Sequence, residues 1–298
     1  MRAFLTRLVT WQDGWAKPFG EFNHRWLSAL FRPIRPVKDV LNGTWLGHPL
    51  HPAVTDVPIG AFAVALVLDV AGQGQAAFLA MMVGQVTFLA ASFTGLADYS
   101  DADGSARTRA TVHGTLMVVA GALTAVSLVL RNGGSAEGTA PTVLLVVSLL
   151  IMTAGAYVGG DVVFALGNMV SRHAFRGAGT KWIRLETGDM PDLATLPEAT
   201  PRKVRAGIND LVVVRFGDTI HALHAVCAHA GGPLDQGIVT PDGCLECPWH
   251  GARYRLADGA LRRGPSVYDQ PAYEIRAAQG GGYEVRRSAS RATSRAAS

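Results

Sequence analysis

Two short stretches of the chain carry thiols and imidazoles at spacings that suit metal binding. Cys227 and His229 form a C-x-H pair, and Cys247 and His250 form a C-x-x-H pair further along. Two thiolates and two imidazoles on paired loops suit either a zinc ion or an iron–sulfur cluster with mixed ligands. The chain has only three cysteines, and Cys244 is the third. An odd, small, clustered set of this kind is not a disulfide framework, so metal chemistry is the expectation.

A zinc site is the simpler alternative. Zinc motifs usually pair cysteines at C-x₂₋₄-C and histidines at H-x₃₋₅-H, and C-x-H is an unusual spacing for them. A chance occurrence is the third reading, but the flanking Gly-Gly-Pro-Leu and Pro-Trp-His-Gly sequences argue against it. In a mixed-ligand [2Fe–2S] cluster, two Cys ligate one iron and two His ligate the other. Each loop supplies one Cys and one His, so a cluster would be held between the two loops. The spacing, unusual for zinc, favours the cluster.

Residues from about Lys181 to Arg287 resemble a Rieske [2Fe–2S] ferredoxin domain. The two sequence boxes of that family are matched by CAHAGGPL and CPWHGARY, and the segment after them by GP at 264–265 and QPAY at 270–273. The resemblance implies an electron-transfer domain of packed β-sheets. It places Cys227 and Cys247 on one iron and His229 and His250 on the other. Around the cluster we expect Gly231, Leu234, Trp249, Ala252 and Tyr254.

The chain departs from the respiratory-complex form of this family. That form has an extra Cys in each box, and these form a disulfide that is absent here. Cys244 is therefore expected to be a free thiol. Ala252 replaces a hydroxyl that would bond a cluster sulfur, although Tyr254 stands where a tyrosine is expected. Fewer hydrogen bonds to sulfur lower the reduction potential, so we expect a ferredoxin-like, lower-potential cluster.

The composition indicates that a large part of the chain lies in a membrane. Hydrophobic residues make up 49% and charged residues 17%, below the roughly 25% charged residues of soluble chains. A helix needs about 20 mostly apolar residues to cross a bilayer. A soluble bundle would show polar helix faces, which these runs lack. Four such runs are predicted, at about 53–71, 76–97, 112–130 and 142–166, with a polar loop at 99–111.

The start of this apolar region also resembles a known family. GHPLHPA at 47–53, followed by DVPIG at 56–60, is similar to the beginning of a four-helix membrane family, DUF2231, with an HPxHP motif. The resemblance covers about residues 40–170. It implies a topology rather than an activity.

Four histidines, His48, His51, His113 and His173, are expected near one face of the membrane. Neutral histidine binds haem iron and other metals well. The alternative is that these side chains cap helices or join a polar interfacial cluster. For His48, His51 and His113 we keep both readings open. If a second centre such as haem b exists, His51 and His113 are the expected ligands.

These features predict a multidomain membrane protein, in which an all-α bundle of four transmembrane helices precedes an all-β Rieske domain. The expected parts are a basic N-terminal segment at 1–39, the bundle at 40–171, the Rieske domain at 178–287 and a disordered tail at 288–298. Thirteen Lys and Arg residues flank the helices on one side, against Arg131 on the other. Positive residues collect on the cytoplasmic side. Both termini and the Rieske domain are therefore expected in the cytoplasm, at the inner (plasma) membrane.

The function expected from this organisation is electron transfer by a membrane-anchored protein. Its partners would be the lipid bilayer, an electron donor such as a ferredoxin reductase, and an unknown acceptor. The sequence lacks a basic stripe with interleaved aromatic residues, so nucleic acid is not an expected partner. The chain would be a component of an oxidoreductase system rather than a complete enzyme.

Two other functions are alternatives to electron transfer. A terminal oxygenase would need a 2-His-1-carboxylate iron site, and no His follows His250. A redox sensor, in which the cluster state controls the bundle, is the alternative that stays open.

Overall fold

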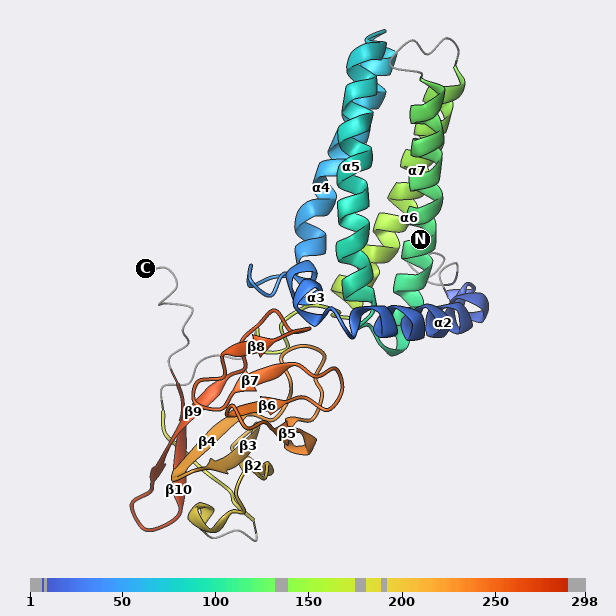
Figure 1. The fold of residues 1–298 in the computed structure, drawn as a ribbon. Helices are drawn as coiled ribbons and strands as arrows, with labels where there is room; N and C mark the ends of the chain where they lie inside the picture. The colour runs from blue at the N-terminus through green and yellow to red at the C-terminus, as the bar shows by residue number, and fades with distance from the viewer. Residues whose placement is uncertain (1–6, 8–9, 132–138, 175–180, 189–191, 289–298) are drawn as a thin grey trace. The chain divides into compact units, whose positions relative to one another are not determined.

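The chain forms two units in the structure, which is a computed structural model (Figure 1). The first unit consists of Met1–Gly43 and Pro49–Asn168, and the second of Thr44–His48 and Met169–Ser298. The described residues are all except 1–6, 8–9, 132–138, 175–180, 189–191 and 289–298. Apart from Ser288, the tail expected to be disordered lies outside the described residues.

The four apolar runs form four long helices of the first unit. Each contains an 18-residue window of mean hydropathy between 1.8 and 2.1, and each is long enough to cross a bilayer. Large apolar side chains such as Val67 and Leu79 remain exposed on their outer faces, as lipid-facing residues do. The helices are α4 (Leu50–Val70), α5 (Gly74–Tyr99), α6 (Gly104–Leu130) and α7 (Ala140–Gly160), the last continued by a π-helical turn, η2 (Asp161–Ala165).

The bundle is built from two helical hairpins, α4 with α5 and α6 with α7 (Figure 1). Each hairpin also packs against the other through α5 with α6 and α4 with α7. Helices α4 and α6 therefore stand at opposite corners of the bundle. The buried apolar core between the helices consists of Phe62, Ala65, Met81, Ala120, Leu145 and Met152.

The polar loop predicted at 99–111 is wrong for most of its length, because α6 already begins at Gly104. Two arginines in this first part of α6 have acidic partners. Arg107 binds Glu21 at 2.7 Å, and Arg109 binds Asp13 at 3.1 Å. Ion pairing lets charged residues continue the helix beyond its apolar stretch. Hydropathy alone could not detect this, because it scores the arginines without their partners.

Those acidic partners lie on a helix that the sequence did not predict. The basic segment at 1–39 contains α2 (Asp13–Phe31), and α3 (Arg35–Asn42) follows it. One face of α2, including Ala16 and Leu27, is buried. Aromatic side chains are exposed on another face: Trp11 just before the helix, then Trp15, Phe19, Phe22 and Trp26. An amphipathic helix of this kind escapes a search for uniformly apolar runs.

A buried ion pair lies at the end of the bundle where α4 and α6 finish. The guanidinium of Arg131 donates two hydrogen bonds to the Asp69 carboxylate, at 2.6 and 2.5 Å. Their side chains are only 2% and 6% exposed. Thr142 donates a further bond to Asp69. The pairing of both charges makes their burial tolerable.

The second unit consists of two antiparallel sheets. The larger has the strand order β1-β10-β9-β4-β3-β2, and the smaller has β5-β6-β7-β8. The larger sheet contains β1 (Ile183–Arg184), β2 (Arg202–Ala206), β3 (Asn209–Phe216), β4 (Thr219–His224), β9 (Ala272–Ala277) and β10 (Tyr283–Arg287). The smaller contains β5 (Ile238–Val239), β6 (Cys244–Glu246), β7 (Arg253–Arg255) and β8 (Leu261–Arg263).

Two tight turns join consecutive strands of the larger sheet. Phe216 pairs with Thr219, so Gly217-Asp218 forms the two-residue turn between β3 and β4. Ala206 pairs with Asn209, so the turn between β2 and β3 comes before Asn209, and Asn209-Asp210 belongs to β3. Asn-Asp, a common turn pair, therefore lies in a strand here.

Candidate metal centre

The four predicted ligands lie on two loops that share one backbone design. In the first loop, the Gly231 N–H donates to the Cys227 carbonyl at 3.0 Å, and the Cys227 N–H donates to the Gly232 carbonyl at 2.9 Å. In the second, Gly251 donates to Cys247 at 3.0 Å, and Cys247 donates to Ala252 at 2.8 Å. Each cysteine is therefore held at the start of a closed turn.

Glycine at the fifth position of each turn has a conformational reason. Gly231 has a φ of 88° and Gly251 a φ of 73°, a region that side chains disfavour. A third glycine, Gly232, is needed for space. A Cβ at Gly232 would lie 2.8 Å from the Cys247 sulfur. The second loop can approach the first only because this side chain is absent.

The two loops bring the two thiols together and the two imidazoles together. Cys227 and Cys247 are hydrogen-bonded to each other through their thiols. The ring centroids of His229 and His250 are 5.0 Å apart, with ring planes at 86°. A tetrahedral metal about 2 Å from each of two imidazole nitrogens holds the centroids about 5 Å apart. The imidazole pair is thus spaced for one shared metal.

The donor set fits two irons better than one zinc ion. Within the part of the chain that the structure describes, no three or more His, Cys, Asp or Glu side chains gather around a single ion position. A structural zinc would draw four donors to one point. A [2Fe–2S] cluster divides them into two thiolates and two imidazoles.

The two thiols are coupled by the hydrogen bond that joins them. This bond to Cys227 lowers the pKa of Cys247 to about 7. The same bond, together with burial, raises the pKa of Cys227. The protein therefore favours one thiolate in the pair. Ligation of a metal requires the second thiol to lose its proton as well.

Tyr254 and Ala252 lie beside the thiols. Tyr254 is fully buried, and its hydroxyl lies 3.2 Å from the Cys227 sulfur. Burial and the nearby thiol raise the pKa of Tyr254. Its hydroxyl therefore stays protonated and can donate a hydrogen bond to a cysteine thiolate. Ala252 is also fully buried, and it presents a methyl group where a serine would present a hydroxyl.

The remaining predicted neighbours differ in exposure. Leu234 is fully buried in the same apolar core as both cysteines. His229 is 6% exposed, whereas Trp249 is 52% exposed and lies beside His250. The thiol side of the centre is thus the inner side, and the surface lies nearest to His250.

Sequence reasoning missed the structural role of Gln270, which is buried. Its amide oxygen accepts from the Ala228 N–H at 2.8 Å, between two predicted ligands. Its amide nitrogen donates to the carbonyls of His224 at 2.7 Å and Val226 at 2.8 Å. One side chain thus ties the first loop to β4. A polar residue before Pro271 was visible in the sequence, but not its burial.

The second loop is held by an arginine that the sequence also left unassigned. Arg263, on β8, donates to the Gly251 carbonyl at 3.0 and 2.7 Å. Arg263 also pairs with Glu246, the residue before Cys247. Cys244 is a buried free thiol, as predicted.

The predicted histidines outside the loops fall into two groups. His51 and His113 come together in the first unit, with ring centroids 6.3 Å apart. His48 and His173 belong to the second unit. The ring of His173 lies against His224, with centroids 4.5 Å apart and planes tilted by 55°, and its Nε2 donates to the Val226 carbonyl. His224, the last residue of β4, is only 1% exposed.

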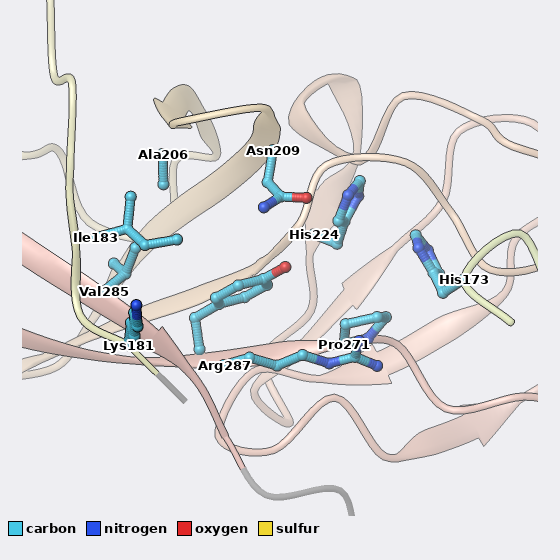
Figure 2. A pocket seen from close by; sticks show the side chains of 10 residues that line it. His173, Lys181, Ile183, Ala206, Asn209, His224, Pro271, Val285 and Arg287 are labelled. Carbon is cyan, nitrogen blue, oxygen red and sulfur yellow. The ribbon is translucent and has the colours of Figure 1, made fainter. Parts of the chain in front are cut away.

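A cavity of about 100 Å³ lies beside the rings of His173 and His224 (Figure 2). Lys181, Asn209 and Arg287 contribute polar groups to its lining. None of the four predicted ligands lines this cavity. It is separate from the candidate metal centre.

Comparison with known proteins identifies both halves of the chain. Residues 189–274 match the family model of the Rieske [2Fe-2S] domain, and residues 47–172 match that of a predicted membrane protein family, DUF2231. Both resemblances expected from the sequence are therefore confirmed. The two Cys–His loops lie within the first matched range.

Individual relatives cover the Rieske part of the chain. The anthranilate 1,2-dioxygenase ferredoxin subunit of Burkholderia cepacia is 35% identical over 83 residues, which are 28% of this chain and 76% of that protein. Ferredoxin CarAc of Metapseudomonas resinovorans is 29% identical over 84 residues, 28% of this chain and 78% of that protein. The solved ferredoxin of carbazole 1,9a-dioxygenase from Nocardioides aromaticivorans IC177 is 28% identical. Its match covers 36% of this chain and 97% of that one, with a TM-score of 0.30.

Proposed function

Because this chain belongs to the Rieske [2Fe-2S] domain family, we propose that it is a membrane-bound carrier of single electrons. Its cluster is ligated by Cys227, Cys247, His229 and His250. The observation that carries this proposal is the pairing of thiol with thiol and imidazole with imidazole at the tips of two matching loops. When bound, the cluster accepts and returns one electron.

The residues around the centre support a ferredoxin-like, lower-potential carrier. Ala252 offers no hydroxyl to a cluster sulfur. The hydroxyl of Tyr254 lies 3.2 Å from the Cys227 sulfur and can donate a hydrogen bond to it. Two relatives are ferredoxins by name, and one is a subunit of a dioxygenase. We infer by analogy that a reductase supplies the electron and that a membrane or soluble redox protein takes it.

The solvent-exposed surface near the two imidazoles is the expected exit for the electron. Trp249 is half exposed next to His250, whereas the thiol side lies in the apolar core. A partner would therefore dock over Trp249 and His250. The bundle would hold the carrier at the membrane.

We place the Rieske domain on the cytoplasmic side. The support is the excess of Lys and Arg in the segments that flank the bundle on the side of both termini. A fluorescent reporter that folds only in the cytoplasm should be bright when fused after Ser298. The same reporter inserted between α6 and α7 should be dark. The reverse pattern would overturn the orientation.

The experiment on the function uses the full chain in detergent. We expect about two irons and two labile sulfides per chain, as a [2Fe–2S] cluster requires, and an EPR signal that appears on reduction. Replacement of His229 or His250 by Ala should abolish that signal. Stoichiometric zinc without sulfide would sink the proposal.

Electron flow separates a carrier from a sensor. A pyridine-nucleotide-dependent ferredoxin reductase should reduce the purified protein, and a Rieske dioxygenase should reoxidise it over many turnovers. The Trp249→Ala variant should slow one of these reactions while keeping its cluster. A cluster that cycles with neither partner, but changes the protease sensitivity of the bundle when reduced, would favour the sensor instead.

A further inference from the structure

A second pair of histidines lies in the first unit, inside the helical bundle. His51 is in the first turn of α4, and His113 is on α6, so the two rings come from opposite corners of the bundle. Their centroids are 6.3 Å apart, and their ring planes are at 80°. Nothing in the proposed electron-transfer function of the Rieske domain requires this arrangement.

Backbone carbonyls fix the same tautomer in both rings. The Nδ1 of His51 lies 2.9 Å from the Ala91 carbonyl, and the Nδ1 of His113 lies 2.8 Å from the Gly155 carbonyl. A carbonyl only accepts, so Nδ1 carries the hydrogen in each ring. Nε2 is then the nitrogen with the lone pair. Metal-bound histidines are held in this way, with the other ring nitrogen donating to a carbonyl or carboxylate.

The two hairpins provide each ring with the same seat. Gly95 lies one turn after Ala91 on α5, and Gly159 lies one turn after Gly155 on α7. A Cβ at Gly95 would lie 2.9 Å from the His51 ring, and a Cβ at Gly159 would lie 2.9 Å from the His113 ring. Each ring therefore rests in a notch made by a glycine and a carbonyl. The same combination of a carbonyl and a glycine thus orients the free nitrogen of both rings. Simple packing of the bundle would not require this repetition.

We propose that His51 and His113 are the two axial ligands of one haem b. A bare ion such as zinc takes four ligands, but the described residues hold no group of three or more His, Cys, Asp or Glu that would bind an ion. A haem brings four nitrogens of its own and needs only axial ligands from the protein. Two imidazoles on opposite sides of one iron, each about 2 Å from it, have centroids about 6 Å apart. The spacing of this pair matches that arrangement.

The test uses the full chain, purified in detergent from cells supplied with a haem precursor. We expect one haem per chain in a pyridine haemochrome assay and a low-spin spectrum from two imidazole ligands. Haemin added to haem-free protein should restore the same spectrum. His51→Ala and His113→Ala should each lose the low-spin spectrum. His48→Ala, outside the pair, should keep it.

Glycine variants separate ligation from general packing. Gly95→Ala and Gly159→Ala keep both imidazoles but push each ring out of its seat, so haem content should fall severalfold. Gly84→Ala is the matched control, because its Cβ would lie 2.7 Å from the Phe62 ring on the same helix hairpin. It should keep the haem if it folds, as judged by its helical circular dichroism and elution volume. The proposal is overturned by a folded wild-type protein that takes up no haem, by a stoichiometric bare metal instead, or by haem that persists in both histidine variants.

Discussion

Each unit of the molecule brings two imidazole rings together at nearly perpendicular angles, and the two pairs differ in what surrounds them. His229 and His250 are 5.0 Å apart on adjacent loops, beside two thiols. His51 and His113 are 6.3 Å apart on separate helices, held by carbonyls and glycines. The first pair belongs to a donor set supplied by the chain. The second would leave most of the coordination sphere to the haem that we propose.

The difference also explains how much of each pair could be predicted from the sequence. Short loops fix the relation between Cys and His through a few backbone bonds, so the spacing itself carries the geometry. For His51 and His113, the sequence indicated only that both lie at the same end of the bundle. Helix packing fixes the distance between their rings, and no local spacing records it.

Removal of the iron should have the largest effect, and it should separate the two units. Metal binding supplies folding free energy to a site built of loops, whereas the bundle is held by apolar packing and by buried ion pairs such as Arg131–Asp69. After anaerobic chelation, amide hydrogen exchange should accelerate by orders of magnitude in residues 225–256. Exchange in α5 and α7 should stay unchanged. Equal acceleration in both units would break the contrast.

The next largest effect is the loss of stability when a buried ion pair is broken. Asp69→Ala leaves Arg131 buried without its partner and should destabilise the bundle by about 3–5 kcal/mol. The double variant with Leu at both positions should be much closer to wild type. Unfolding in detergent, followed by helical circular dichroism, measures both.

The exposed pair of Lys203 and Asp210 in the second unit provides the control. Their side chains are 54% and 40% exposed. Lys203→Ala should therefore change stability by less than about 1 kcal/mol. A similar loss for Asp69→Ala would show that the bundle pair is open to water.

Gln270→Leu should destabilise the second unit by about 3 kcal/mol, because it removes three buried hydrogen bonds. The loss of cluster absorbance during a urea titration reports it. Gln236→Leu, at an exposed site, should stay within about 0.5 kcal/mol of wild type. If both variants behave alike, Gln270 does not tie the first loop to β4.

The smallest effects are on the reduction potential. Tyr254→Phe removes a donor to the Cys227 sulfur and should lower the midpoint by roughly 50 mV, about 1 kcal/mol for one electron. Ala252→Ser adds a hydroxyl beside Cys247 and should raise it by a similar amount. Redox titration followed by EPR measures both shifts. We expect the two midpoint potentials to shift in opposite directions. Shifts of the same sign would mean that one of these side chains does not face a cluster sulfur.

Most of the fold could be predicted because its signals are local. The apolar runs fixed four helices, and the two sequence boxes fixed the loops with Cys227 and Cys247. Three features could not be predicted, since each depends on distant partners. The early start of α6 needs Glu21 and Asp13, the burial of Gln270 needs the carbonyls of His224 and Val226, and the amphipathic helix α2 needs the bundle to pack against.

The Arg131–Asp69 pair has a consequence for how the bundle responds to voltage. A membrane potential does about 2.3 kcal/mol of work per 100 mV on one elementary charge that crosses it. A cation and an anion held 2.5 Å apart move through the field together, so the work on one cancels the work on the other. An energised membrane therefore exerts no net pull on this end of the bundle as long as the pair stays closed.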